Sequence, residues 1–177
     1  TLRFVAHEFF LPLGSFCLHK TRGNSPWRLG WLVVPENLIR AARARIGNLF
    51  LTPPSLSQHA GLAAFDCCDE LEGHIATYRR NRDLLLNALP ALGLNHIAPP
   101  DGAFYIYADI GHLTDDSLGF CKELLLATGV TTAPGVDFDP VRGHRFMRFS
   151  FAVSTDRIEE AIRRMIPWFR QKSADKK

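Results

Sequence analysis

The stretch AFYIYADI, residues 103–110, decides the fold class of this 177-residue chain. It is rich in aromatic and β-branched residues, and it is bounded by Asp101-Gly102 on one side and Gly111 on the other. This composition between turn-forming residues predicts a β-strand. The elements on either side of the strand then indicate what kind of domain contains it.

Apolar residues at helical spacing predict helices before and after this strand. One helix is expected from Asp69 to near Pro90 or Gly93, and another over residues 114–128. Further upstream, a helix begins at Pro35 after a predicted strand. A short helix follows, and Ser55 with Gln58 has the spacing of a capping box at its start.

Two more strands and a helix complete the pattern. VTTAPGVDF, residues 130–138, predicts a short strand followed by a turn, and RFMRFSFAV, residues 145–153, predicts a strand. In the second strand Phe146, Arg148 and Ser150 share one face. With a C-terminal helix after Ser154, the order from about residue 70 is helix, strand, helix, strand, strand, helix. The predicted fold class is therefore α/β, with a small layered domain in the C-terminal part.

Composition narrows the possible functions. Hydrophobic residues make up 46% of the chain and charged residues 22%, enough to bury a core. The net charge of +3 comes from basic residues interleaved with acids, which argues against nucleic acid as a partner. No apolar run approaches the roughly 20 residues of a membrane span, so we expect no membrane partner and a cytoplasmic location. The histidines lack the spacing of a metal site, so we expect no metal.

Arg148 needs more than a packing explanation. A charged side chain on a strand with aromatic neighbours is costly unless it is paired or faces a polar ligand. One interpretation is an arginine on an exposed edge. The other is a functional arginine, because the guanidinium fork matches a carboxylate with two parallel hydrogen bonds.

Five separated stretches occur in an order that resembles a known family. They are WRLGWLVVPENLI (27–39), NLFLTPPSLSQHAGLAAFD (48–66), DGAFYIYADI (101–110), APGVDF (133–138) and RFMRFSFA (145–152). Together they resemble the C-terminal half of a class I/II aminotransferase, a pyridoxal-phosphate enzyme of the aspartate aminotransferase type with fold type I. The resemblance is colinear from Trp27 to nearly the end of the chain.

The resemblance implies an activity and three site residues. Lys20 would form the Schiff base with pyridoxal 5′-phosphate and shuttle the proton, and Arg28, eight residues later, would bind the phosphate. Arg148 would hold the α-carboxylate of the substrate. The implied reaction moves an amino group between an amino acid and a 2-oxo acid in amino acid metabolism and biosynthesis, and the implied assembly is a homodimer. The same resemblance places the loop with Asp137 and Asp139, which we expect to form a turn, near the mouth of the cofactor site.

The sequence also departs from the family before Trp27. Cys17-Leu18-His19 stands where the family carries Ser-x-Ser ahead of the lysine, so residues 1–26 are expected to be a diverged segment. We predict a remnant of the large cofactor-binding domain over residues 1–50, including the start of the interdomain helix, and the small domain with connecting helices over residues 51–177. The acid that faces the pyridine nitrogen would lie outside this chain, so the chain alone is expected to be weakly active or inactive. The alternative is a non-catalytic aminotransferase-like module or a decayed paralogue.

Overall fold

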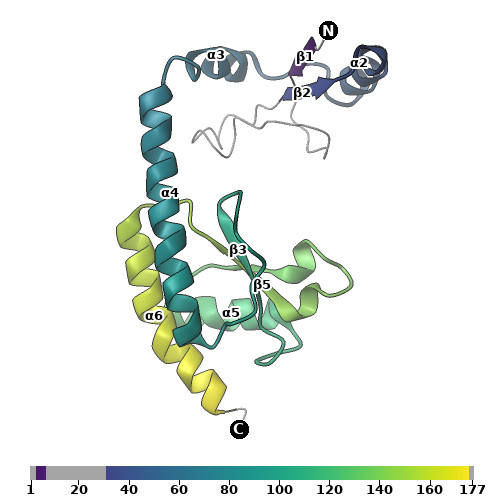
Figure 1. The fold of residues 1–177 in the computed structure, drawn as a ribbon. Coiled ribbons are helices and arrows are strands. Elements are labelled where there is room, and N and C mark those ends of the chain that lie inside the picture. The colour runs from purple at the N-terminus through teal and green to yellow at the C-terminus, as the bar shows by residue number, and fades with distance from the viewer. Residues whose placement is uncertain (1–2, 7–30, 176–177) are drawn as a thin grey trace. The chain divides into compact units, whose positions relative to one another are not determined.

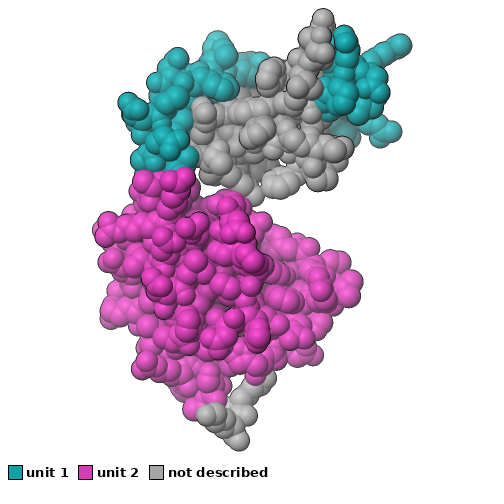
Figure 2. Space-filling view, viewed as in Figure 1, with its two compact units in different colours: residues 1–75 teal, residues 76–177 magenta. Residues whose placement is uncertain are grey.

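The computed structural model describes residues 3–6 and 31–175 (Figure 1). The chain divides into two compact units, residues 1–75 and 76–177 (Figure 2). Lys20 and Arg28 lie outside the described residues. The domain boundary expected between residues 50 and 51 stays a prediction. It concerns the large and small domains of the whole family fold, whereas the compact units divide only this chain.

Within residues 3–6 and 31–67, the first unit contains a two-stranded sheet and two helices. Strand β1 (Arg3–Ala6) pairs antiparallel with β2 (Trp31–Val34). Helix α2 (Glu36–Phe50) follows directly, and α3 (Ser55–Ala63) comes next. Pro35 precedes the first turn of α2, where a missing N–H leaves no backbone donor unsatisfied. The strand and both helices predicted here are confirmed, whereas β1 was not predicted.

The capping box predicted from Ser55 and Gln58 is wrong. Pro54 occupies the N-cap position of α3, and no side chain caps this end. Ser55 is already the first helical residue, so its hydroxyl is one position too late to accept from the third helical N–H. The Gln58 Nε2 group instead donates to the carbonyl oxygen of Pro53 at 2.9 Å.

The second unit has the predicted order of elements. Helix α4 (Cys68–Ala88) leads into it and is followed by η2 (Leu89–Leu92), β3 (Tyr105–Asp109), α5 (Ser117–Thr128), β4 (Ala133–Pro134), η3 (Gly135–Asp137), η4 (Gly143–Arg145), β5 (Phe146–Ser150) and α6 (Thr155–Ala174). The three strands form an antiparallel sheet in the order β3-β5-β4, so β5 lies in the middle. In this register Tyr107 lies directly opposite Arg148.

One face of this sheet forms the core of the second unit. The core-facing strand residues and the helices behind them belong to a single cluster of buried side chains, which includes Ile106, Ala108, Met147 and Phe149 from the sheet and Leu85, Leu124, Met165 and Phe169 from α4, α5 and α6. Figure 1 shows α4 and α6 running side by side next to the sheet. An antiparallel sheet that packs on one face leaves its alternate residues for the other face. Arg148 therefore lies on the face away from the core, as the alternation predicted.

Hydrogen bonds from the buried Asn81 side chain on α4 hold the segment that follows β5. The Asn81 Nδ2 group donates to the carbonyl oxygens of Phe151 at 3.1 Å and Val153 at 2.7 Å. Both carbonyls follow β5, so this side chain fixes the chain where it leaves the sheet. Among residues 3–6 and 31–175, no helix combines the length and apolar character that crossing a membrane requires.

Candidate functional site

The sheet face turned away from the core carries a pocket of about 300 Å³. Tyr105 and Tyr107 from β3 and Arg148 from β5 line it, together with Phe138 and Asp139 from the loop between η3 and η4. The strand residues come together because they share one face and pair across the sheet. The pocket therefore combines one cation, one carboxylate and three aromatic rings.

Arg148 contacts aromatic rings in this pocket. Its Cζ atom lies 4.1 Å from the centre of the Phe138 ring and 5.1 Å from the centre of the Tyr105 ring. Within the part of the chain that the structure describes, its guanidinium has no ion pair and no hydrogen bond. Such a half-buried cation gains some stabilisation from the rings, but no described residue uses its N–H donors. The arrangement can bind an anion from solution.

Asp139 lines the same pocket but does not neutralise Arg148. Its Oδ1 atom accepts from the backbone N–H groups of Val141 at 2.9 Å and Arg142 at 3.0 Å, and its Oδ2 accepts from Arg142 Nε at 3.3 Å. The hydrogen bonds from the backbone of Arg142 and Val141 lower the pKa of this carboxyl, and the Arg142 side chain adds to the effect. The carboxylate is thus engaged by its own loop, which confirms that this segment forms a turn.

Tyr107 lines the pocket with an uncharged aromatic ring. Its ring stacks on Phe146 with centroids 4.9 Å apart and planes 6° from parallel. Its hydroxyl is buried and has no hydrogen-bond partner among the described residues. Burial raises the pKa of this phenol, and the negative charge of Asp139 raises it further. Tyr107 is therefore neutral at physiological pH, and Arg148 supplies the positive charge of the pocket.

Two glycines hold the loop that carries Phe138. A Cβ atom added to Gly143 would come within 2.5 Å of the Val136 nitrogen and would also collide with the carbonyl group of Gly135. A Cβ atom added to Gly135 would lie 2.7 Å from both the Phe146 carbonyl oxygen and the Tyr107 hydroxyl. These are backbone or anchored atoms that cannot move aside cheaply. The close approach of the two backbone segments therefore requires glycine at both positions.

An ion pair fixes the far end of β3 against the start of β5. The Asp109 Oδ2 atom accepts from Arg145 Nη2 at 2.9 Å, and its Oδ1 accepts from the Gly111 backbone N–H at 2.8 Å. Burial acts to raise the pKa of Asp109, but the hydrogen bonds from Gly111 and Arg145 outweigh it, and the pKa is lowered. The pair supports the strand register that places Tyr107 opposite Arg148.

This ion pair gives an acid-sensitive contribution to stability. Because the folded-state pKa of Asp109 lies below its unfolded value of about 3.9, its contribution is present above that pH and is lost as pH falls through the folded-state pKa. We expect Asp109→Asn to lower the free energy of unfolding at pH 7 by up to about 1 kcal/mol. In chemical denaturation the difference in the free energy of unfolding between wild type and the variant will narrow as pH falls below about 3.9.

Arg145→Gln is the partner variant for this measurement. It is expected to cause a similar loss at pH 7, and the double variant will add little to either single change. A difference in the free energy of unfolding between wild type and Asp109→Asn that does not change as pH falls would show that charge on Asp109 does not matter.

Of the three site residues expected from sequence, the structure places one. Arg148 lies in the pocket, whereas Lys20 and Arg28 lie outside the described residues and stay predictions. Tyr105 and Phe138 are neighbours of Arg148 that the sequence did not reveal. Strand alternation places Tyr105 on a definite face, but the strand pairing that brings it to Arg148 has no signal in residue spacing.

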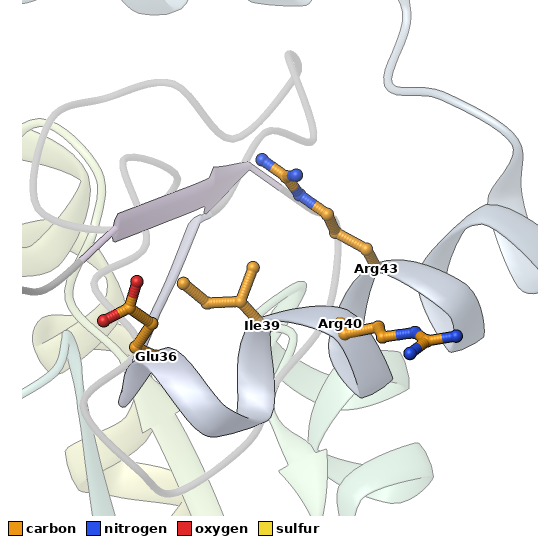
Figure 3. Close-up of a pocket in the computed structure, with 4 residues that line it drawn as sticks. All are labelled: Glu36, Ile39, Arg40 and Arg43. Atoms are coloured by element: carbon orange, nitrogen blue, oxygen red, sulfur yellow. The ribbon is translucent and has the colours of Figure 1, made fainter.

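A second pocket, on α2, does not form a comparable site. It is lined by Glu36, Ile39, Arg40 and Arg43. The two arginines extend from the helix in different directions, so their guanidinium groups do not converge on one point (Figure 3). In residues 3–6 and 31–175, no group of three or more histidine, cysteine, aspartate or glutamate side chains is arranged to hold a metal ion.

Comparison with known proteins gives a consistent result. A sequence model of the family described as "Aminotransferase class I and II" matches residues 15–165. A valine–pyruvate aminotransferase of Mycobacterium tuberculosis is 51% identical over 144 residues, covering 80% of this chain and 37% of the relative. An aspartate aminotransferase of Sulfurisphaera tokodaii is 34% identical, covering 82% of this chain and 38% of the relative.

Solved structures agree with the sequence relatives. The crystal structure of an aminotransferase from Mycobacterium tuberculosis matches with a TM-score of 0.79 and 47% identity, covering 87% of this chain and 40% of that one. The chain thus spans about two fifths of the length of the proteins that it matches. The matched part includes β3, β5 and the loop between η3 and η4, which form the Arg148 pocket.

Proposed function

The chain belongs to the class I and II aminotransferases, and from this premise we propose that it serves pyridoxal-phosphate-dependent transfer of an amino group between an amino acid and a 2-oxo acid. The observation that carries the proposal is Arg148. It is a cation in a small pocket, in contact with aromatic rings, and no carboxylate among the described residues forms an ion pair with it.

The chemistry of Arg148 suits both substrates. An amino acid and a 2-oxo acid share an α-carboxylate, and a guanidinium binds a carboxylate through two parallel N–H donors. One arginine is therefore sufficient to orient either substrate through its α-carboxylate. The pocket volume of about 300 Å³ is at the lower end of the range for small-molecule sites, which suits ligands of this size.

The cofactor is proposed from the family. The described residues fit the carboxylate of a substrate, because Arg148 has unused donors in the pocket. We propose that Lys20 binds pyridoxal 5′-phosphate and moves the proton at the substrate α-carbon, and that Arg28 holds the phosphate. When bound, the cofactor supplies an electron sink for the carbanion that proton removal generates. Arg148 holds the substrate by its carboxylate during that transfer.

The relatives suggest where to begin with substrates. One relative is named for valine and pyruvate and another for aspartate, so we propose a small 2-oxo acid such as pyruvate as the first acceptor to test. We also propose that the protein acts in amino acid biosynthesis, as a homodimer in the cytoplasm. Family membership supports these proposals.

Absorption spectroscopy tests whether this chain binds its cofactor. We expect the chain mixed with pyridoxal phosphate to keep a visible absorption band after gel filtration, because a Schiff base to a lysine absorbs there. Lys20→Ala will lose the band, and Lys122→Ala, which changes an exposed lysine on α5, will keep it. A wild-type chain without a band would contradict cofactor binding by this polypeptide, and a band that survives Lys20→Ala would show that Lys20 is not the attachment site.

A further inference from the structure

We propose that Phe138 and Tyr105 are positioning residues that hold the Arg148 guanidinium ready for a carboxylate. The inference rests on the proposed function, because it concerns how the same pocket receives its substrate. It assigns a task to two aromatic side chains from different elements, one on β3 and one on the loop after η3.

The strand register explains which ring Arg148 contacts. Tyr107 lies directly opposite Arg148, but its ring stacks on Phe146, which is two residues before Arg148 on the same face of β5. Tyr105 lies diagonally across from Arg148, within reach of a long side chain. The Arg148 Cζ accordingly lies 5.1 Å from the centre of the Tyr105 ring. Two diagonal side-chain contacts thus form on this face. Because the Tyr107 ring stacks on Phe146, the β3 ring that contacts Arg148 is that of Tyr105.

Phe138 makes the closer contact from outside the sheet. Its ring centre lies 4.1 Å from the Arg148 Cζ, although half of the Phe138 residue is exposed to solvent, 50% by area. The loop that presents it is fixed by the backbone contact of Gly135 with Gly143 and by the hydrogen bonds to Asp139. Its backbone N–H also donates to the Gly135 carbonyl oxygen at 2.9 Å. A half-exposed aromatic ring on an ordered turn is therefore kept over the guanidinium.

Aromatic contacts suit an arginine that must stay available. A protein carboxylate would stabilise the charge but would occupy the N–H donors that the substrate needs. A ring attracts the cation through its π electrons and does not use those donors in strong hydrogen bonds. It also restricts the rotamers of a long side chain, so less conformational entropy is lost when the substrate binds. Phe138 and Tyr105 can thus retain the charge, limit its motion and leave its donors unoccupied.

Leucine at position 138 distinguishes the attraction between the aromatic ring and the Arg148 cation from simple apolar packing. It keeps an apolar side chain but removes the π face, so we expect Phe138→Leu to weaken pyruvate binding by about three- to tenfold. Phe138→Tyr keeps the ring and will bind within about twofold of wild type. Phe65→Leu is the matched control, because Phe65 is similarly exposed at 53% and belongs to the other compact unit. Dissociation constants come from NMR titration of the full chain with pyruvate.

A second readout does not depend on pyruvate. A ring over the guanidinium shifts the Arg148 Nε–Hε resonance, which can be assigned by its loss in Arg148→Gln. We expect Phe138→Leu to move this resonance and Phe138→Tyr to leave it nearly in place. Tyr105→Leu will move it less than Phe138→Leu, because its ring is farther from the guanidinium.

The two readouts distinguish the possible failures. If Phe138→Leu binds pyruvate as tightly as wild type and leaves the Nε–Hε resonance unchanged, the positioning role is overturned. If wild type and Arg148→Gln both fail to bind pyruvate, the proposed function fails for this chain, and the resonance alone decides whether Phe138 holds the arginine. A loss of binding that Phe138→Tyr does not restore would also count against an aromatic requirement.

Discussion

Replacing Arg148 by glutamine will weaken pyruvate binding by about a hundredfold or more. The variant removes a charge-assisted pair of hydrogen bonds to the carboxylate, and glutamine offers only a neutral amide in its place. Because Arg148 makes no hydrogen bond within the described part of the protein, the same change will have little effect on the free energy of unfolding. NMR titration gives the affinity, and chemical denaturation gives the stability.

A lysine at this position separates charge from geometry. Arg148→Lys keeps the positive charge but loses the planar fork, so its affinity is expected to lie between those of wild type and the glutamine variant. Arg170→Gln, at an exposed position in α6, is the matched control for loss of one arginine and will bind pyruvate as wild type does. Equal affinities in wild type and Arg148→Gln would remove the basis for assigning carboxylate binding to this pocket.

Replacing Gly143 by alanine will lower the free energy of unfolding of the second unit by about 3 kcal/mol. The new Cβ would meet the carbonyl group of Gly135 and the nitrogen of Val136, which are backbone atoms and cannot rotate away. The two loop segments must separate, which also displaces Phe138 from Arg148. We therefore expect this variant to bind pyruvate more weakly as well. Chemical denaturation followed by circular dichroism measures the loss.

A second glycine in the same unit provides the control for this substitution. A Cβ added to Gly102 meets no atom within 4 Å, so Gly102→Ala is expected to change the free energy of unfolding by less than about 0.5 kcal/mol. The chemical change is the same in both variants, and only the surroundings differ. If Gly143→Ala were as stable as Gly102→Ala, the close approach of the two loop segments would not be a feature of the folded protein.

Sequence patterns were sufficient for most of the second unit. Apolar periodicity located α4, α5 and α6. Strand alternation placed Arg148 on the face of β5 that is turned away from the core. These signals are local, because each depends on residues that are neighbours in one helix or strand. The capping box failed for a local reason too, since Pro54 takes the cap position and moves Ser55 into the helix.

The surroundings of Arg148 depend on contacts that no local pattern encodes. Tyr105 reaches it through the pairing of β3 with β5, and Phe138 reaches it through the fold of the loop between Gly135 and Gly143. The sequence predicts Tyr105 in a strand and Phe138 in a turn. Both predictions agree with the structure, but neither indicates that the two rings contact the Arg148 guanidinium.

A crystal structure of the chain with pyruvate tests the central claim most directly, which is that the Arg148 guanidinium receives a substrate carboxylate. We predict the two carboxylate oxygens of pyruvate at about 2.7–2.9 Å from guanidinium nitrogens of Arg148, with the Phe138 ring still over Cζ. Pyruvate bound elsewhere, or Arg148 paired with a carboxylate of the protein itself, would contradict it.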